Sequence, residues 1–258
     1  MDAAGVRTRI ETRADGTEVG WVTLDNPGKI NIVDSGLCHD LRDAIAKLGD
    51  EPELRAMVLT GAGDRAFIGG ADIGEMAALE PDTAKAFITG LHQVCAALRD
   101  APVPVIARIL GYCLGGGLEV AASCDIRVAA DDARFGMPEV RVGIPSVIEA
   151  ALLPSLIGWG KTRELLFTGA VIDAAEALAC GLVEKVVPAA TLDQAVDDWL
   201  DGITASGPQA IRAQKALIRQ WQELPLDEAV MAGVDVFADA YRTDEPRTRM
   251  QAFLKRKR

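Results

Sequence analysis

A glycine-rich turn in the middle of the chain is the feature that most limits how it can fold. An apolar run at residues 102–110, rich in Val and Ile and bounded by Pro and Gly, predicts a buried strand, and the small apolar residues 118–124 predict a packed helix. Between them lies GYCLGGGLE, residues 111–119. Three consecutive glycines at a strand-to-helix turn let the backbone approach a ligand closely and leave first-turn N–H groups free. Such donors suit a developing oxyanion, and Glu119, about one helical turn away, adds an acid/base group.

Two further motifs place similar groups elsewhere in the chain. The sequence AFIGGADIGEM, residues 66–76, follows a strand-like run at 56–60 and leads into a segment of helical character. A glycine pair therefore again opens a loop before a helix. The sequence FGMPE, residues 135–139, places Glu139 twenty positions after Glu119. The chain thus offers two glycine loops and two glutamates.

Four motifs taken together resemble the crotonase superfamily, the enoyl-CoA hydratase/isomerase family. They are GGADI at 69–73, GGGLE at 115–119, CDI at 124–126 and FGMPE at 135–139, in the family's order and spacing. Weaker likeness extends from about Trp21 to about Phe253. The resemblance implies an α/β fold, the crotonase-like spiral of β-β-α units with a helical C-terminal trimerisation region.

The resemblance also implies roles for individual positions. Ala71 N–H and Gly116 N–H match the family's oxyanion hole for the thioester oxygen, and Glu119 and Glu139 match its two catalytic carboxylates. An aromatic and a basic residue near the C-terminus of the family's chains reach the nucleotide part of CoA bound to a neighbouring subunit. For the basic tail, as for a lone lysine that matches a phosphate contact, a solvated surface is the alternative. The substrate-binding residues that the resemblance implies are Lys29, Ile30, Gly69, Gly70, Asp72, Ile73, Gly115, Gly117, Pro138, Phe253 and Arg256.

The implied reaction is hydration of a double bond. With both glutamates retained, the resemblance favours a 2-enoyl-CoA hydratase, in which one carboxylate activates water and the other delivers a proton to the α carbon. The oxyanion donors stabilise the charge that appears on the thioester oxygen. The partner is then an acyl-CoA thioester substrate, and we expect no metal and no cofactor besides the CoA of that substrate. The alternatives are an enoyl-CoA isomerase, an acyl-CoA hydrolase of the same superfamily, and a non-catalytic acyl-CoA-binding paralogue.

The segment after Glu139 departs from the family pattern and keeps these alternatives open. Typical hydratases have Ile-Pro-Gly-x-Gly-Gly-Thr here, whereas this chain has GIPSVIEA at residues 143–150. Bulkier side chains replace glycine where the acyl chain and the catalytic water are expected. Glu149 is either an additional carboxylate at the pocket rim or a first-turn helix residue favoured by the helix dipole, and we prefer the second interpretation.

The composition argues against several other classes of protein. A formal net charge of −11 disfavours binding to nucleic acid or to an anionic membrane, since both need a positive surface. The chain has no run of eighteen apolar residues and no signal-peptide pattern, which predicts a cytoplasmic protein. Five scattered cysteines, never spaced as CxxC, make a disulfide scaffold or a zinc site improbable. His39 and His92 are expected to be solvated or to cap helices, so no Cys/His or Ser/His pair is predicted.

Hydrophobic periodicity predicts alternating strands and helices around a mainly parallel sheet. An Asp15-Gly16 turn indicates a hairpin near the N-terminus. Pro154 is expected to bend or interrupt a helix. Strands are expected at 6–11, 18–25, 56–60, 103–110 and 125–129, and helices at 35–48, at 146–157 and from 191 onward.

The last part of the chain is helical and carries apolar residues that need a surface to cover. We therefore divide the chain into residues 1–195, a core with the CoA-thioester site, and residues 196–258, a helical C-terminal region. A partner subunit is one surface that this region could cover, and the resemblance implies a homotrimer or a dimer of trimers.

Overall fold

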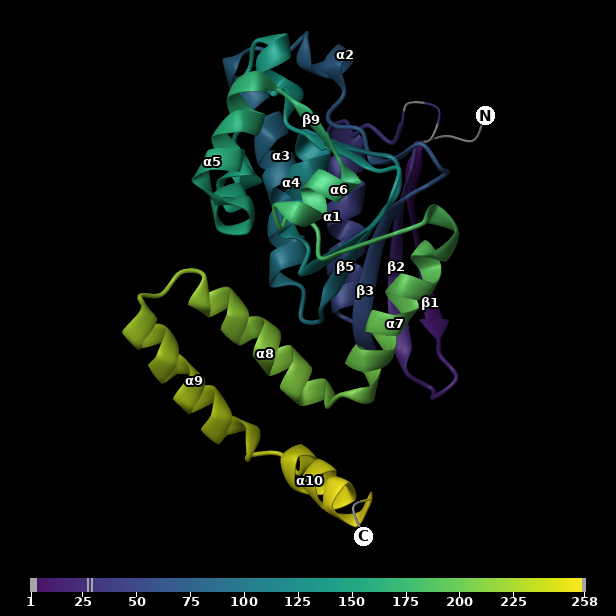
Figure 1. The fold of residues 1–258 in the computed structure, drawn as a ribbon, viewed down its shortest axis with the longest axis vertical. Coiled ribbons are helices and arrows are strands. Elements are labelled where there is room, and N and C mark those ends of the chain that lie inside the picture. The colour runs from purple at the N-terminus through teal and green to yellow at the C-terminus, as the bar shows by residue number, and fades with distance from the viewer. Residues whose placement is uncertain (1–3, 27, 29, 257–258) are drawn as a thin grey trace.

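The computed structural model describes residues 4–26, 28 and 30–256. Its larger sheet has six strands, of which β1, β2, β3 and β5 are labelled in Figure 1. The strand order is β1-β2-β3-β5-β7-β10. The first two strands form an antiparallel hairpin, and all other neighbours in this sheet are parallel, as the sequence predicts. The strands are β1 (Gly5–Thr12), β2 (Glu18–Asp25), β3 (Leu54–Gly61), β5 (Val105–Ile109), β7 (Ile126–Ala130) and β10 (Lys185–Val187).

A second sheet of four three-residue strands has the order β4-β6-β8-β9. Along the chain, β3, β5 and β7 each continue directly into one strand of this second sheet, and the first two of these pairs then lead into helices. This repeat of strand, strand and helix builds a spiral, so the predicted β-β-α architecture is confirmed. The strands are β4 (Ala66–Ile68), β6 (Tyr112–Leu114), β8 (Arg134–Gly136) and β9 (Val171–Asp173).

Helices cover both faces of the larger sheet, which explains why its central strands β3, β5 and β7 are mostly apolar. On one face, α1 (Ser35–Gly49) buries apolar residues at helical spacing against the sheet, and Asp34 caps the helix by accepting the N–H of Leu37. α3 (Pro81–Asp100) packs beside α1. On the other face, α7 (Leu192–Ala205) packs on the sheet through Leu192, Ala195, Val196 and Leu200.

The shorter helices connect these layers. Gly181, with a φ of +84°, follows α6 directly after its C-cap and ends the helix. The remaining elements before the C-terminal region are α2 (Ile73–Met76), α4 (Gly116–Ser123), η2 (Pro138–Val142), η3 (Ile148–Leu152), α5 (Leu153–Thr168), α6 (Ala174–Ala179) and η4 (Ala189–Thr191), where η marks a 3-10 helix.

The prediction of one helix over residues 146–157 is wrong in its first part. The chain there forms the 3-10 helix η3, and α5 begins only at Leu153. Pro154 lies in the first turn of α5, where a missing N–H costs nothing, so it starts the helix instead of interrupting it. The break in α5 comes at Gly158, whose φ of +70° is not helical.

Three helices form an arm that leaves the core at the lower end of Figure 1: α8 (Pro208–Trp221), α9 (Leu226–Ala240) and α10 (Glu245–Arg256). The buried ammonium group of Lys215 fixes the root of this arm. It donates to the carbonyls of Leu98 and Val103, each at 3.0 Å, and pairs with Asp125 at 2.7 Å. The predicted division after residue 195 falls inside α7 and stays a prediction. No helix in the described part of the chain is long and apolar enough to cross a membrane.

Candidate active site

The two glycine turns leave neighbouring strands of the smaller sheet at the same edge. β4 and β6 are parallel, with Ile68 opposite Cys113, so the turns that follow them lie side by side. A Cβ on Gly117 would lie 2.2 Å from the carbonyl oxygen of Ile68, and a Cβ on Gly70 would lie 3.4 Å from that of Leu114. Only glycine therefore allows the second turn to pack against the first.

Hydrogen bonds on either side of Ala71 fix the orientation of its peptide group. Val33 donates its N–H to Gly70 O at 2.9 Å and accepts the N–H of Asp72 at 2.8 Å. The side chain of Asp72 then caps α2 by accepting the N–H of Gly74. Within the part of the chain that the structure describes, no protein acceptor takes the N–H of Ala71, so this donor is available to a ligand.

Gly116 offers a second donor because it is the first residue of α4. The preceding Gly115, at φ +55°, donates its N–H to Gly136 O at 2.9 Å and accepts the N–H of Glu119 at 3.1 Å. The N–H of Gly116, like that of Ala71, has no acceptor among the described residues. Leu91 of α3 lies against Gly116, where a Cβ would come within 2.6 Å of its Cδ2.

Glu119 is buried in α4 and holds its proton more tightly than an exposed carboxyl group. Glu119 is only 3% exposed, and its Oε1 accepts the N–H of Ala150 at 2.9 Å. Burial raises the pKa of Glu119 to about 8; the Ala150 bond lowers it, while the charges of Glu139 and Glu149 raise it further. Glu119 is therefore a proton donor at neutral pH.

Glu139 reaches the same turn from a different element. It lies in η2 and is partly exposed, and the hydroxyl of Ser146 donates to its Oε2 at 2.8 Å. Its Oε1 rests against Gly115, since a Cβ there would be only 2.7 Å away. The structure therefore brings both predicted catalytic carboxylates to the turn that carries the Gly116 N–H.

Some of the predicted substrate-binding residues lie near the two glycine turns, and others lie far from them or outside the described residues. Ile30 lies on the first glycine loop, because Gly69 donates to Ile30 O at 3.0 Å and a Cβ on Gly69 would clash with the Ile30 side chain. Ile73 is exposed beside this loop, and Pro138 opens η2 next to Glu139. Phe253 instead lies exposed on α10, at the far end of the arm (Figure 1). Lys29 and the side chain of Arg256 lie outside the described residues.

Glu149 lies in the first turn of η3, as the preferred interpretation has it, but the structure adds a set of contacts to α3 that the sequence does not indicate. It is 4% exposed, and its Oε1 lies 2.9 Å from His92 Nδ1 and 3.8 Å from Arg99 Nη1. The side chain of His92 is half exposed, as expected for a solvated histidine, but its Nδ1 also meets this buried carboxyl group. The positions 92, 95 and 99 share one face of α3 by their spacing, but nothing in the sequence says that a carboxylate from 57 positions away meets this face.

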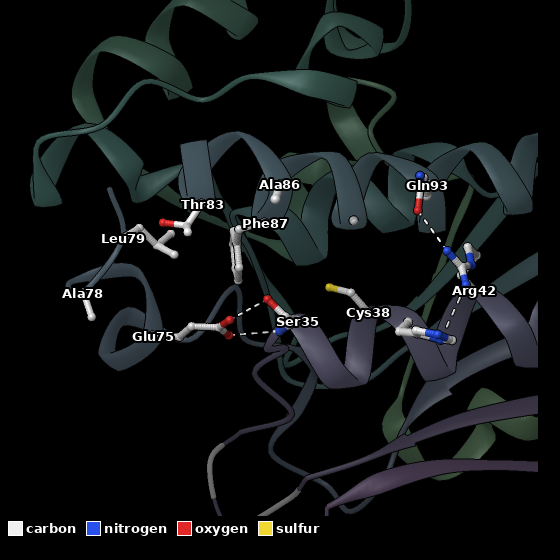
Figure 2. Close-up of a pocket in the computed structure, with 12 residues that line it drawn as sticks. Ser35, Cys38, Arg42, Glu75, Ala78, Leu79, Thr83, Ala86, Phe87 and Gln93 are labelled. Atoms are coloured by element: carbon white, nitrogen blue, oxygen red, sulfur yellow. Dashed lines mark hydrogen bonds between the residues drawn. The ribbon is translucent and has the colours of Figure 1, made fainter. Parts of the chain in front are cut away.

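One cavity of the described structure is lined by neither Glu119 nor Glu139. It measures about 610 Å³ between α1, α2 and α3, and Glu75 crosses it to accept the N–H and hydroxyl of Ser35 at 2.9 and 2.5 Å (Figure 2). The free N–H groups of Ala71 and Gly116 and the two glutamate carboxyl groups lie instead at the two glycine turns, which is why we place the candidate site there. Among the described residues, no group of three or more His, Cys, Asp or Glu side chains is arranged to hold a metal ion.

A β-β-α spiral with two glycine turns and two glutamates at one edge defines the class, the crotonase-fold proteins. The sequence pattern described as enoyl-CoA hydratase/isomerase matches residues 15–258. The chain belongs to the enoyl-CoA hydratase/isomerase family.

Individual relatives agree with this assignment. The short-chain enoyl-CoA hydratase of Clostridium acetobutylicum is 34% identical over 242 residues, 93% of each chain, and the crotonyl-CoA hydratase of Syntrophomonas wolfei is 34% identical over 236 residues, 91% of each. Among solved structures, the enoyl-CoA hydratase of Bacillus anthracis has a TM-score of 0.89 at 30% identity, over 96% of both chains. The enoyl-CoA hydratase of Mycobacterium smegmatis has a TM-score of 0.91 at 28% identity, again over 96% of both chains.

Proposed function

We propose that this chain is an enoyl-CoA hydratase, which reversibly adds water across the 2,3 double bond of a 2-enoyl-CoA thioester. The observation that carries the proposal is the buried Glu119, whose raised pKa of about 8 keeps a proton beside Glu139 and the free N–H of Gly116. The names of the relatives, short-chain enoyl-CoA hydratase and crotonyl-CoA hydratase, support the same reaction.

The two unpaired N–H groups are proposed to bind the thioester oxygen. When water adds to the β carbon, the thioester becomes enolate-like and negative charge moves onto this oxygen. Donors that are already oriented stabilise this charge without reorganising, and each is worth roughly 3 to 4 kcal/mol in comparable oxyanion holes. The bonds from Val33 to the residues on either side of Ala71, and the first turn of α4 at Gly116, supply that orientation.

The two glutamates are proposed to divide the proton transfers. Hydration needs one ionised carboxylate to take a proton from water and one protonated carboxyl group to deliver a proton to the α carbon. Two neighbouring carboxyl groups hold their protons as a pair, and in the substrate-free chain the proton is stored on Glu119. Ser146 and Ala150 each bind one oxygen of a glutamate and so leave the other oxygen to the reacting atoms.

The remaining predicted contacts follow from this arrangement. Gly69, Gly70, Gly115 and Gly117 are proposed to let the thioester approach the backbone, with Asp72, Ile73 and Pro138 beside it. Lys29 and Ile30 are proposed to lie against the CoA moiety, and no cofactor is proposed besides the CoA of the substrate.

The position of Phe253 and α10 on an arm remote from the glycine turns supports the proposal that Phe253 and Arg256 serve a neighbouring subunit in a homotrimer or a dimer of trimers. The cytoplasmic location stays a prediction from the sequence.

The test is a steady-state assay on crotonyl-CoA and longer 2-enoyl-CoA thioesters, with the product identified by mass. We expect a product heavier by one water, and a loss of kcat of at least about a hundredfold in Glu119→Gln and in Glu139→Gln. Glu164→Gln, which changes an exposed glutamate on α5, is the matched control and should retain wild-type kcat. A product of unchanged mass that needs only Glu139 would instead indicate an isomerase, and wild-type rates in both site variants would exclude the proposal.

A further inference from the structure

Glu149 is a buried acidic residue that the proposed reaction does not use. Its carboxyl group faces His92 and Arg99 of α3, and its Oε2 is buried without a hydrogen-bond partner among the described residues. Removing a carboxylate from water is costly unless nearby cations and donors compensate. A residue of this kind next to a reactive site therefore calls for an explanation beyond packing.

The neighbour of Glu149 in the chain touches the reactive glutamate directly. The N–H of Ala150 donates to Glu119 Oε1 at 2.9 Å. The residue before Glu149 is Ile148, whose φ of +37° is strained for a β-branched side chain. A turn that contains such a residue keeps its conformation only when surrounding contacts hold it, and the contact of Glu149 with α3 is one that does so.

We propose that Glu149 is a positioning residue for Glu119. Anchored by His92 and Arg99, it holds the Ala150 N–H against one oxygen of Glu119 and leaves the other oxygen directed at the reacting atoms. The inference rests on the proposed role of Glu119 as an acid/base group, and it adds three residues, Glu149, His92 and Arg99, that set the geometry and proton affinity of that group.

The charge of Glu149 gives this arrangement a second effect. The two buried carboxyl groups, those of Glu119 and Glu149, are faced by His92, Cys95 and Arg99 on α3 and by Glu139 on η2. The negative charges of Glu139 and of Glu149 itself raise the pKa of Glu119. Removing the charge of Glu149 should therefore lower the pKa of Glu119, whereas a purely structural contact would leave it unchanged.

Four variants separate the anchor from the charge. Glu149→Gln keeps an oxygen acceptor for His92 and removes the charge, whereas Glu149→Ala removes both. His92→Ala removes the anchoring donor, and His92→Asn restores an N–H close to the place of Nδ1. Glu164→Gln and His39→Asn change the same residue types on exposed helix faces and are the matched controls.

The readout that does not depend on turnover is the pKa of Glu119 itself. It is measured on the substrate-free protein by carbon-13 NMR of labelled Glu side chains, with the Glu119 signal assigned by its loss in Glu119→Gln. We expect the pKa to fall by roughly one unit in Glu149→Gln, the size typical of removing one neighbouring charge. For turnover, kcat should fall about tenfold in Glu149→Ala with KM nearly unchanged, and His92→Asn should recover most of the kcat lost in His92→Ala.

The outcomes distinguish this inference from the proposed function. If the wild-type chain hydrates no enoyl-CoA, but the Glu119 pKa rises in His92→Ala through loss of the Ala150 bond and returns in His92→Asn, the reaction is wrong and the positioning role stands. If the wild type is active and the Glu149 and His92 variants match their controls in both pKa and kcat, the positioning role is overturned. Should Glu149→Ala fail to fold, Glu149→Gln and the two His92 variants decide the question.

Discussion

The carboxylate of Glu139 lies directly against the α carbon of Gly115, so closely that a single added carbon would come within 2.7 Å of its Oε1. The two residues are held by different elements, η2 and the turn before α4. Glycine at this position therefore does two things, since it allows a φ of +55° and it leaves room for the carboxylate.

Gly115→Ala is expected to lower kcat by about a hundredfold or more, because the new methyl group displaces Glu139 and a displacement of about 1 Å can cost that much. Gly16→Ala is the control. Gly16 has a φ of +82° and no atom within 4 Å of an added Cβ, so it carries the same backbone strain without touching the site. Equal kcat values in the two variants would show that the contact with Glu139 is unimportant.

Ser146→Ala removes the hydroxyl that binds Glu139 Oε2 at 2.8 Å. A hydrogen bond to a charged group is worth about 1.5 to 3 kcal/mol, so we expect kcat to fall roughly tenfold while KM changes little. Ser146→Thr keeps the hydroxyl and should retain most of the activity. If the alanine and threonine variants lose activity to the same extent, the bulk of the side chain matters and not the hydrogen bond.

Glu119→Gln should stabilise the folded chain, and more so at higher pH. The folded state holds the proton of Glu119 up to about pH 8, compared with an ordinary value of 4.5, so its contribution to stability is fully present below pH 4.5 and is lost as the pH rises through 8. Glutamine does not titrate and escapes this loss. We expect the variant's advantage in unfolding free energy to grow from near zero at pH 4.5 to about 5 kcal/mol at pH 9.

Urea unfolding at several pH values measures this difference. The exposed variant Glu164→Gln provides the reference, because its carboxylate lies at the surface beside Lys161. A difference between Glu119→Gln and wild type that does not vary between pH 4.5 and 9 would contradict the raised pKa.

Asn31 joins the segment after β2 to the ends of β3 and β4 and should be important for stability. It is fully buried, and its amide donates to Ala62 O at 2.8 Å and to Ala66 O at 2.7 Å while its Oδ1 accepts the N–H of Asn26 at 2.9 Å. Asn31→Ala is expected to cost about 2 to 4 kcal/mol of unfolding free energy, because it leaves buried polar groups unsatisfied.

Asn31→Asp should cost more, since a carboxylate would face the two carbonyl oxygens without a donor. Asn26→Ala, which loses one side-chain bond to Ile32 O at 3.0 Å, is the comparison and should cost clearly less. An Asp variant as stable as wild type in urea unfolding would rule out the donor role of the Asn31 amide.

The architecture could be predicted because its signals are local or carried by motifs. The hairpin turn at Asp15-Gly16, the helical spacing from Leu37 to Leu48 and the glycine turn before Glu119 all appear in the structure where the sequence places them. The resemblance supplied the order of the units. The strands of the smaller sheet were not predicted, because three residues show no periodicity, and their pairing is set by the register of neighbouring strands.

The partners of the site residues could not be predicted for a different reason. Ser146 meets Glu139 only because Gly143, at φ +84°, turns the chain back after η2. Glu149 meets His92 across 57 positions, and Ala150 meets Glu119 across 31. Such contacts depend on how separate elements dock, which no local pattern in one sequence describes.

The three bonds of the Lys215 ammonium have a consequence for how subunits could come together. They join α8 to the end of α3, to the residues just before β5 and to the turn between α4 and β7. They fix the direction of α8, while Trp221 donates to Ala229 O of α9 and Glu245 of α10 accepts the N–H groups of Gln209 and Ala210 at the start of α8. The exposed α9 and α10 are thus held in place within a single chain, so a neighbouring molecule would meet a rigid surface. Association through a preorganised arm of this kind restricts few additional backbone torsion angles, which favours one defined assembly over a mixture of arrangements.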